Sequence, residues 1–312
     1  MRPRGGTTAQ LRRVAVLFAA SFSVATACVE DVDLGQFHQE SGVTTGGSAG
    51  TTSVDLGGAM SEAGQAGAVS ESCTQKLCAD KLYACGDCSD NDGDGNVDEA
   101  DSQCLGPCDN TEDSFFGSIS GANNAPCRQD CYFDSDTGAG NDDCYWNQKC
   151  DPLSLPEDYP PSGDAQCSYD EMASTPGSGA TCTGLREQQS TMCTDMCMPY
   201  TPNGCDCFGC CELPAGSGAF VWIGSTNNGA GSCSEETLGE ASACRPCTPV
   251  PSCFNECGEC EVCAGRPDPD PTCAGPDDNG CGDGYQACGR PGQGPCEPGM
   301  YCITGCCITV PK

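Results

Sequence analysis

The chain is poor in histidine, in basic side chains and in aromatic residues. Only one of its 312 residues is histidine, His38, and 13 Lys and Arg stand against 45 Asp and Glu, giving a net charge of −32. Without further histidine, a Ser or Cys nucleophile has no histidine base and a His-ligated zinc hydrolase has no ligands. A surface so acidic repels nucleic acid. We therefore expect a protein that is not an enzyme and binds no nucleic acid.

Aromatic residues make up only 6% of the chain, so it can bury little apolar surface. Its 33 cysteines compensate, because each disulfide contributes typically about 2–4 kcal/mol. Thiols at this density pair in oxidising compartments outside the cytoplasm. We predict a small, disulfide-rich, mostly irregular ectodomain with a few short helices and strands, preceded by a disordered N-terminal tether.

The first 27 residues have the three zones of a signal peptide. Four arginines within positions 1–13 precede an apolar stretch, Val14–Val24, and the small residues Ala25-Thr26-Ala27 follow. The apolar stretch is shorter than the about 20 residues of a transmembrane helix. These features predict an exported protein, either in the cell envelope, at the outer membrane, or secreted.

Cys28 follows directly and completes a segment, Val24 to Cys28, that resembles a bacterial lipobox. The usual Leu three positions before the cysteine is Ala25 here, so ordinary cleavage after Ala27 remains an alternative. Acylation of Cys28 leaves an even 32 cysteines to pair. Residues 28–71, rich in Gly, Ser, Thr and Ala, then predict a flexible tether from a lipid anchor in the membrane.

Three Cys-rich blocks are expected beyond the tether: 72–151, 152–265 and 266–312, the last opened by a Pro-rich linker. Apolar residues at helical spacing predict one helix over 183–198, with Leu185, Met192, Cys193, Met196 and Cys197 on one face. A second short helix is expected to align Cys253, Cys257 and Cys260. Residues 219–223 predict a strand.

The most specific pattern is the acidic segment between Cys88 and Cys104. Ca²⁺ takes about six to eight oxygen ligands, and alternating acids in a tight turn supply them. Gly95 permits the turn, Asn96 would offer its backbone carbonyl, and Val97 would pack against the protein. The candidate ligands are Asp90, Asp92, Asp94, Asn96, Asp98 and Asp101.

This loop resembles the calcium loops of thrombospondin type 3 repeats and of EF-hands. Its twelfth position is Asp101 where an EF-hand has Glu, and Cys104-Leu-Gly-Pro-Cys108 cannot continue as a long exit helix. The resemblance therefore implies a structural calcium site rather than an opening sensor. The longer context, Cys85 to Cys104, resembles the metal-binding motif of Cys-rich surface lipoproteins of myxobacteria, a family that implies location but no activity.

Two weaker acidic clusters are expected to be solvated turns rather than further cation sites. One holds Asp134, Asp136 and Asn141 to Asp143, and the other holds Asp277 to Asn279 with Asp283.

Cys-x-x-Cys spacings would indicate zinc in a cytosolic protein, but after export disulfides are favoured. The densest cysteine clusters are Cys205, Cys207, Cys210 and Cys211, and Cys306 with Cys307. The members of each adjacent pair are expected to bond to different partners.

The expected function is surface display, through adhesion or ligand binding, by a cell-envelope protein with a structural Ca²⁺ site and an unknown surface partner. Soft-metal sequestration of zinc or copper by reduced cysteines is one alternative. A secreted inhibitor- or toxin-like module, Cys273–Cys307, is another. A hydrolase using paired carboxylates would need a cleft that holds two of them at catalytic separation.

Overall fold

The computed structural model describes residues 73–118, 123–124, 127–134, 142–153, 167–175, 177–227, 229–266, 281, 284–290 and 292–310. They belong to a unit that spans Gly67–Lys312. The predicted signal peptide, Cys28, His38 and the tether lie outside the described residues, as do Asp136, Asn141, Cys273, Asp277 to Asn279 and Asp283. None of the described helices has the length and apolar character needed to cross a membrane.

Regular structure in the described residues is sparse, as expected of a disulfide-rich chain, and consists of short strands, single-turn 3-10 helices and two short α-helices. The strands are β1 (Leu77–Cys78), β2 (Lys81–Leu82), β3 (Asn123–Asn124), β4 (Arg128–Gln129), β5 (Trp146–Asn147), β6 (Cys210–Glu212), β7 (Phe220–Trp222), β8 (Thr226–Asn227), β9 (Ala230–Gly231), β10 (Arg245–Pro246), β11 (Met300–Ile303) and β12 (Cys306–Thr309). The helices are η1 (Ala84–Gly86), η2 (Asp98–Ala100), η3 (Gln148–Cys150), α1 (Cys182–Glu187), α2 (Thr191–Cys197), η5 (Met198–Tyr200), η6 (Glu235–Thr237) and η7 (Pro251–Cys253).

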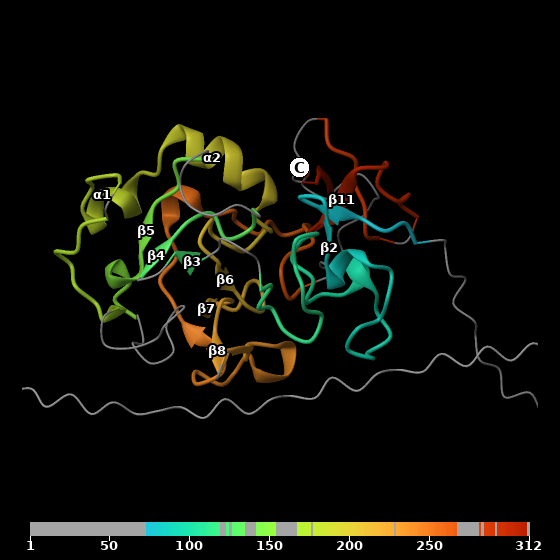
Figure 1. Ribbon diagram of the computed structural model, residues 1–312, viewed down its shortest axis with the longest axis horizontal. Coiled ribbons are helices and arrows are strands. Elements are labelled where there is room, and N and C mark those ends of the chain that lie inside the picture. The colour runs from blue at the N-terminus through green and yellow to red at the C-terminus, as the bar shows by residue number, and fades with distance from the viewer. Residues whose placement is uncertain are drawn as a thin grey trace, which may run out of the picture. The chain divides into compact units, whose positions relative to one another are not determined.

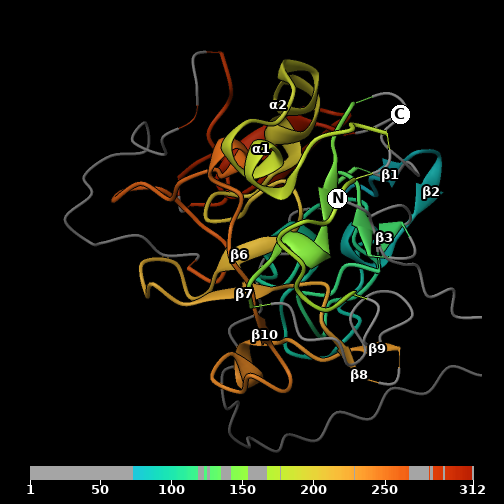
Figure 2. The same ribbon diagram turned by 90° about the vertical axis from the view of Figure 1, so that its left-hand side faces the viewer.

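The sheets are small and antiparallel. Of the sheets in the part of the chain that the structure describes, two have three strands, in the orders β10-β7-β6 and β3-β4-β5, and the others are two-stranded hairpins. Figure 2 shows β6 and β7 side by side with β10 at their edge. The strand predicted at 219–223 is confirmed as β7, whose Trp222 is buried and donates from Nε1 to the Phe208 carbonyl at 3.2 Å.

The predicted helix over 183–198 is wrong, because the chain breaks between α1 and α2. Gln188 is extended (φ −155°, ψ 108°), and Ser190 caps α2 by accepting the Cys193 N–H at 3.0 Å. Met192 and Met196 are exposed, whereas Leu185, Cys193 and Cys197 are buried. The disulfides made by the two cysteines therefore set which face of α2 points inward.

The predicted second helix through Cys253, Cys257 and Cys260 is also wrong. Only the single turn η7 forms, and it ends at Cys253. The chain then folds back so that Cys257 bonds to Cys263, six residues later. A helix would separate residues six apart by about 9 Å along its axis, whereas this disulfide holds the two Cα atoms at 5.9 Å.

Disulfides connect the described residues throughout. Every described cysteine is disulfide-bonded, and fifteen bridges join described residues. The main core cluster draws on all three predicted blocks: Leu105 and Phe115 come from the first, Val221 from the second and Tyr301 from the third. In Figure 1 the red strand β11 lies beside the cyan and teal chain of residues 73–118. The C-terminal hairpin is thus part of the core that supports the acidic loop.

Candidate metal centre

The acidic loop turns tightly, as its glycines predict. Asp90 accepts the backbone N–H of Gly93 at 2.6 Å through Oδ1 and that of Gly95 at 3.1 Å through Oδ2. Both glycines have positive φ, 87° and 99°, a conformation that costs other residues about 1–2 kcal/mol. These contacts close the first half of the loop around the Asp90 carboxylate.

The next acids repeat this local pattern at the exposed rim of the loop. Asp92 accepts the Asp94 N–H at 2.9 Å, and Asp94 accepts both the N–H and the side-chain amide of Asn96, at 2.7 and 2.8 Å. Asp90, Asp92, Asp94 and Asn96 are all exposed. The carboxylates of the three aspartates accept backbone N–H groups and still face water.

Four further carboxylates of the same block are almost completely buried. They are Asp98, Asp101, Asp109 and Glu112, with exposed fractions of 4, 3, 0 and 2%. The ion pair found among the described residues of this block, Lys76 with Glu99 at 2.6 Å, includes none of them. Burying acidic groups without a counter-charge is costly, so their surroundings determine what the loop can bind.

Asp101 is the buried residue that faces the rim. Its Oδ1 accepts the Gln103 N–H at 2.7 Å, whereas its Oδ2 is buried and has no hydrogen-bond partner among the described residues. Burial raises the pKa of Asp101 to about 6; the Gln103 N–H lowers it, and the charges of Asp94, Asp92 and Glu112 raise it further. These three carboxylates therefore lie close enough to Asp101 for mutual repulsion.

Asp98 is oriented differently from the other predicted ligands. Its carboxylate accepts the Cys88 N–H, at 3.0 Å to Oδ2, and lies 3.2 Å from the Cys73 sulfur of the Cys73–Cys88 disulfide. Burial raises the pKa of Asp98 to about 6, opposed by the Cys88 N–H and reinforced by Glu112 and Asp87. Asp98, near the end of the loop, thus connects to Cys88, which precedes the loop.

Asp109 lies deeper still. Its oxygens accept the N–H groups of Thr111 at 3.1 Å and Leu105 at 3.3 Å. Burial raises the pKa of its carboxyl well above the usual range, and the charges of Asp101 and Glu112 add to this. The Asp109 oxygens are therefore engaged by the chain on both sides of Cys108.

Glu112 was not among the sequence candidates. It follows the loop by eleven residues, and no spacing rule connects it to the alternating acids. The disulfides Cys85–Cys104 and Cys78–Cys108 fold this part of the chain back against the loop. Its position four residues after Cys108 is the only sequence signal that could have identified it.

The predicted cysteine clusters form disulfides with separate partners, as expected for the adjacent pairs. Cys205 bonds to Cys211, Cys207 to Cys253 and Cys210 to Cys247. Cys306 bonds to Cys281 and Cys307 to Cys296. Each described Cys-x-x-Cys spacing spans two different bridges, so none is a dithiol redox or zinc pair.

One of the weaker acidic clusters is partly assembled. The carboxylates of Asp134 and Asp142 lie within 4.8 Å of each other and of the Cys131 sulfur, and all three residues are buried. Cys131 is bonded to Cys197, so its sulfur is not a thiolate ligand. Asp143 lies in the described chain beside Asp142 and has a positive φ of 59°.

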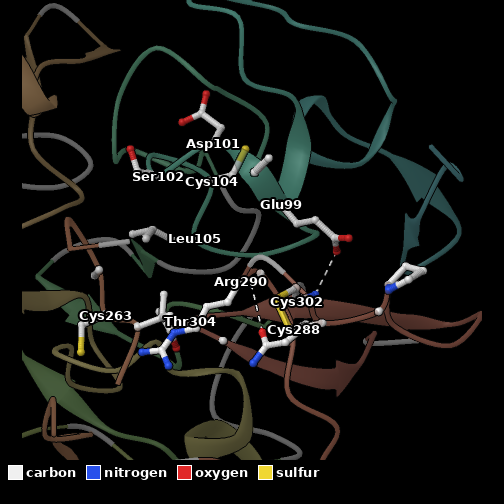
Figure 3. Close-up of a pocket in the computed structure, with 18 residues that line it drawn as sticks. Glu99, Asp101, Ser102, Cys104, Leu105, Cys263, Cys288, Arg290, Cys302 and Thr304 are labelled. Atoms are coloured by element: carbon white, nitrogen blue, oxygen red, sulfur yellow. Dashed lines mark hydrogen bonds between the residues drawn. A yellow bond between two sulfur atoms is a disulfide. The ribbon is translucent and has the colours of Figure 1, made fainter. Parts of the chain in front are cut away.

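A cleft of about 350 Å³ is lined in part by the last residues of the acidic loop. Residues 99–102, 104 and 105 form one wall, and residues 262–264, 288–290, 293–295, 302, 304 and 305 form the rest. Figure 3 shows that the Asp101 carboxylate points away from Arg290 and Cys302, whereas Glu99 extends toward Cys302. Both acids thus line the cleft, but only Glu99 extends its carboxylate toward the C-terminal hairpin.

No protein-family model matches the chain, and comparisons with curated proteins and with solved structures find no match either. The assignment of this centre therefore rests on its residues and their geometry.

Proposed function

We propose that the protein is an exported, lipid-anchored cell-envelope ectodomain whose loop at 90–101 binds a structural calcium ion. The observation that carries this proposal is the buried, unpartnered Oδ2 of Asp101, which is surrounded by the charges of Asp92, Asp94 and Glu112. A divalent cation would give that oxygen a partner and neutralise the repulsion. Carboxylate oxygens are the ligands that Ca²⁺ prefers.

The ion would bind at the boundary between the exposed rim and the buried acids. Asp92 and Asp94 supply oxygens from the rim and Asp101 from below. Asp90 and Asp98 fix the turn and the base of the loop through backbone N–H groups. Extracellular calcium modules bind with a Kd of roughly 10⁻⁴–10⁻³ M, so calcium in the environment would fill the site.

Calcium titration of the full-length oxidised protein tests this proposal. We expect binding heat in the range given above, and a stabilisation of about 1.4 kcal/mol at tenfold excess over the Kd. Asp101→Asn should weaken binding by about tenfold, because it removes one ligand charge. Asp195→Asn, an exposed position on α2, serves as the matched control. No heat and no stabilisation with the wild-type protein would refute the site.

The lipid anchor has its own test. Cys28→Ala removes the acylated thiol and should move the protein from the membrane fraction to the soluble exported fraction. The intact mass of the wild-type protein should show acyl chains and no thiols that react with an alkylating agent. Release of wild-type protein cleaved after Ala27, without acyl chains, would instead support plain secretion.

The alternative of soft-metal sequestration requires thiolates. All described cysteines are in disulfides, which disfavours soft-metal sequestration.

An autonomous toxin-like C-terminal module is disfavoured because Tyr301, Ile303, Ile308 and Val310 pack into the shared core. As for a carboxylate hydrolase, the cleft is lined by Glu99 and Asp101, but Glu99 is engaged by Lys76 and Cys302 while Asp101 points away. Surface display by adhesion or ligand binding, to a partner still to be identified, remains the proposed role.

A further inference from the structure

The proposed calcium loop lacks the residue that closes an EF-hand-like site. The twelfth position is Asp101, whose side chain is one methylene shorter than the Glu that usually gives bidentate coordination. Asp101 also uses one of its two oxygens to accept the Gln103 N–H. A site built only from residues 90–101 is therefore short of one carboxylate.

Glu112 is hydrogen-bonded to both arms of the loop. Its Oε2 accepts the Asn91 N–H at 2.6 Å and its Oε1 accepts the Asp98 N–H at 2.9 Å. These two donors belong to opposite arms of the loop, so the Glu112 carboxylate sits between the arms. Only 2% of the residue is exposed.

The same carboxylate acts on the acids around it. Its charge raises the pKa of Asp101, Asp98 and Asp109. An ionised carboxylate has about four lone-pair positions, and the two N–H donors use two of them. The remaining lone pairs are available to a cation held by Asp92, Asp94 and the unpartnered Oδ2 of Asp101.

The residue Glu112 also lines a hollow of about 380 Å³. The hollow is lined by Ala84, Asn91, Asp92, Asn110, Thr111, Glu112 and Asp113. Asp92 belongs to the exposed rim of the loop and Glu112 to its buried side, so the hollow is lined by one predicted ligand together with Glu112.

We propose that Glu112 is a calcium ligand supplied from outside the loop, and that it takes the role of the missing twelfth-position Glu. This inference rests on the proposed calcium function. It adds that the site is completed by a second chain segment, which the disulfides Cys85–Cys104 and Cys78–Cys108 hold in place. The site therefore depends on correct oxidation of the block.

The test compares Glu112→Gln with Asp113→Asn in the full-length oxidised protein. Asp113 is the adjacent acid, lines the same hollow and is exposed, which makes it the matched control. Calorimetry with Ca²⁺ gives the affinity. Terbium luminescence lifetimes in H₂O and D₂O give the number of water molecules on the bound ion.

We expect Glu112→Gln to weaken calcium binding about tenfold or more and to add about one water to bound terbium, because the lost ligand is replaced by solvent. Asp113→Asn should change the affinity less than about twofold. Binding by wild type with an unchanged affinity in Glu112→Gln would overturn the inference. So would weaker binding with an unchanged water count, since Glu112 would then only position the loop.

Two outcomes separate this inference from the calcium site itself. If the wild-type protein binds neither Ca²⁺ nor terbium, the proposed function fails first. If Glu112→Gln does not form its disulfides, Glu112→Asp replaces it, since it keeps the charge but shortens the reach. It should bind calcium more weakly than wild type and carry an extra water on terbium, and wild-type values for both would overturn the assignment.

Discussion

The carboxylate of Glu99 accepts the backbone N–H of Cys302 at 3.0 Å, although the two residues are 203 positions apart in the chain (Figure 3). Glu99 lies in η2, between Asp98 and Asp101 of the acidic loop, and Cys302 lies in the C-terminal hairpin. The same carboxylate also pairs with Lys76. One side chain therefore links the proposed calcium loop to the hairpin that closes the core.

This contact predicts that Glu99→Ala loosens the hairpin. The Cys302 amide would lose its acceptor in a buried position, at a cost of about 1–3 kcal/mol. Hydrogen exchange, followed residue by residue, should become faster at Cys302 in this variant. Glu99→Gln, which keeps a carbonyl oxygen as acceptor, should have a smaller effect, and Glu236→Ala, at an exposed position, should have none.

Calcium should act through the same contact. If the ion orders the loop, its addition to wild-type protein slows exchange at Cys302 but has no such effect in Glu99→Ala. Equal calcium protection in both proteins would mean that the loop and the hairpin are not coupled through Glu99.

A second prediction concerns the packing around Trp222. A methyl group at Gly224 would lie 2.1 Å from the Trp222 ring, whereas one at Gly239 would meet nothing within 4 Å. Gly224→Ala should therefore lower the free energy of unfolding by about 1–3 kcal/mol or prevent correct oxidation. Gly239→Ala should leave stability unchanged or raise it by about 0.4–1 kcal/mol. Thermal unfolding of the two variants checks this, and similar midpoints would contradict the close packing of Gly224 against Trp222.

The fold class, the strand at 219–223 and the separate partners of adjacent cysteines could be predicted from the sequence, because each depends on composition or local pattern. The break between α1 and α2 could not be seen in apolar spacing. Met192 and Met196 each precede a cysteine by one residue, so they share the helical period of Cys193 and Cys197. The bridges at those cysteines turn the methionines outward.

For the candidate site, the sequence predicted the alternating acids but neither the orientation of Asp98 nor the presence of Glu112. Both depend on disulfides between residues far apart in the chain. Spacing does not reveal which cysteines pair, because pairing follows from three-dimensional proximity. Glu112, which we propose as a ligand, could therefore be identified only from the structure, in which the bridges Cys85–Cys104 and Cys78–Cys108 place it against the loop.

A third prediction follows from the bridges themselves. The chain-entropy model gives about 4 kcal/mol for Cys131–Cys197, which are 66 residues apart, and about 2 kcal/mol for Cys257–Cys263, which are six apart. These are upper values, because neighbouring bridges already restrain the unfolded chain. Replacing both cysteines of a pair by serine should thus lower the unfolding midpoint more for the first pair than for the second. The reverse order would show that local packing outweighs loop length.

The last prediction concerns Asp206, a buried acid in the second cysteine cluster. Its Oδ1 accepts the N–H groups of Phe208 and Cys210 at 2.9 and 2.8 Å, and its Oδ2 accepts that of Val250 at 2.8 Å. Burial raises the pKa of Asp206 to about 7, although the three N–H groups lower it and Asp151 adds a smaller upward contribution. In the unfolded chain the pKa of an aspartate is about 3.9.

Between pH 4 and pH 7 the folded protein therefore holds a proton on Asp206 that the unfolded chain releases. The stabilising contribution of this group is fully present below about pH 4, falls as the pH rises through this window, and is lost above about pH 7. Thermal unfolding in a calcium chelator should show the midpoint falling over this range. The fall should be shallower in Asp206→Asn and unchanged in Asp195→Asn. Carbon NMR of the Asp206 carboxyl gives the midpoint directly, and a value below 4 would mean that the three N–H donors outweigh burial.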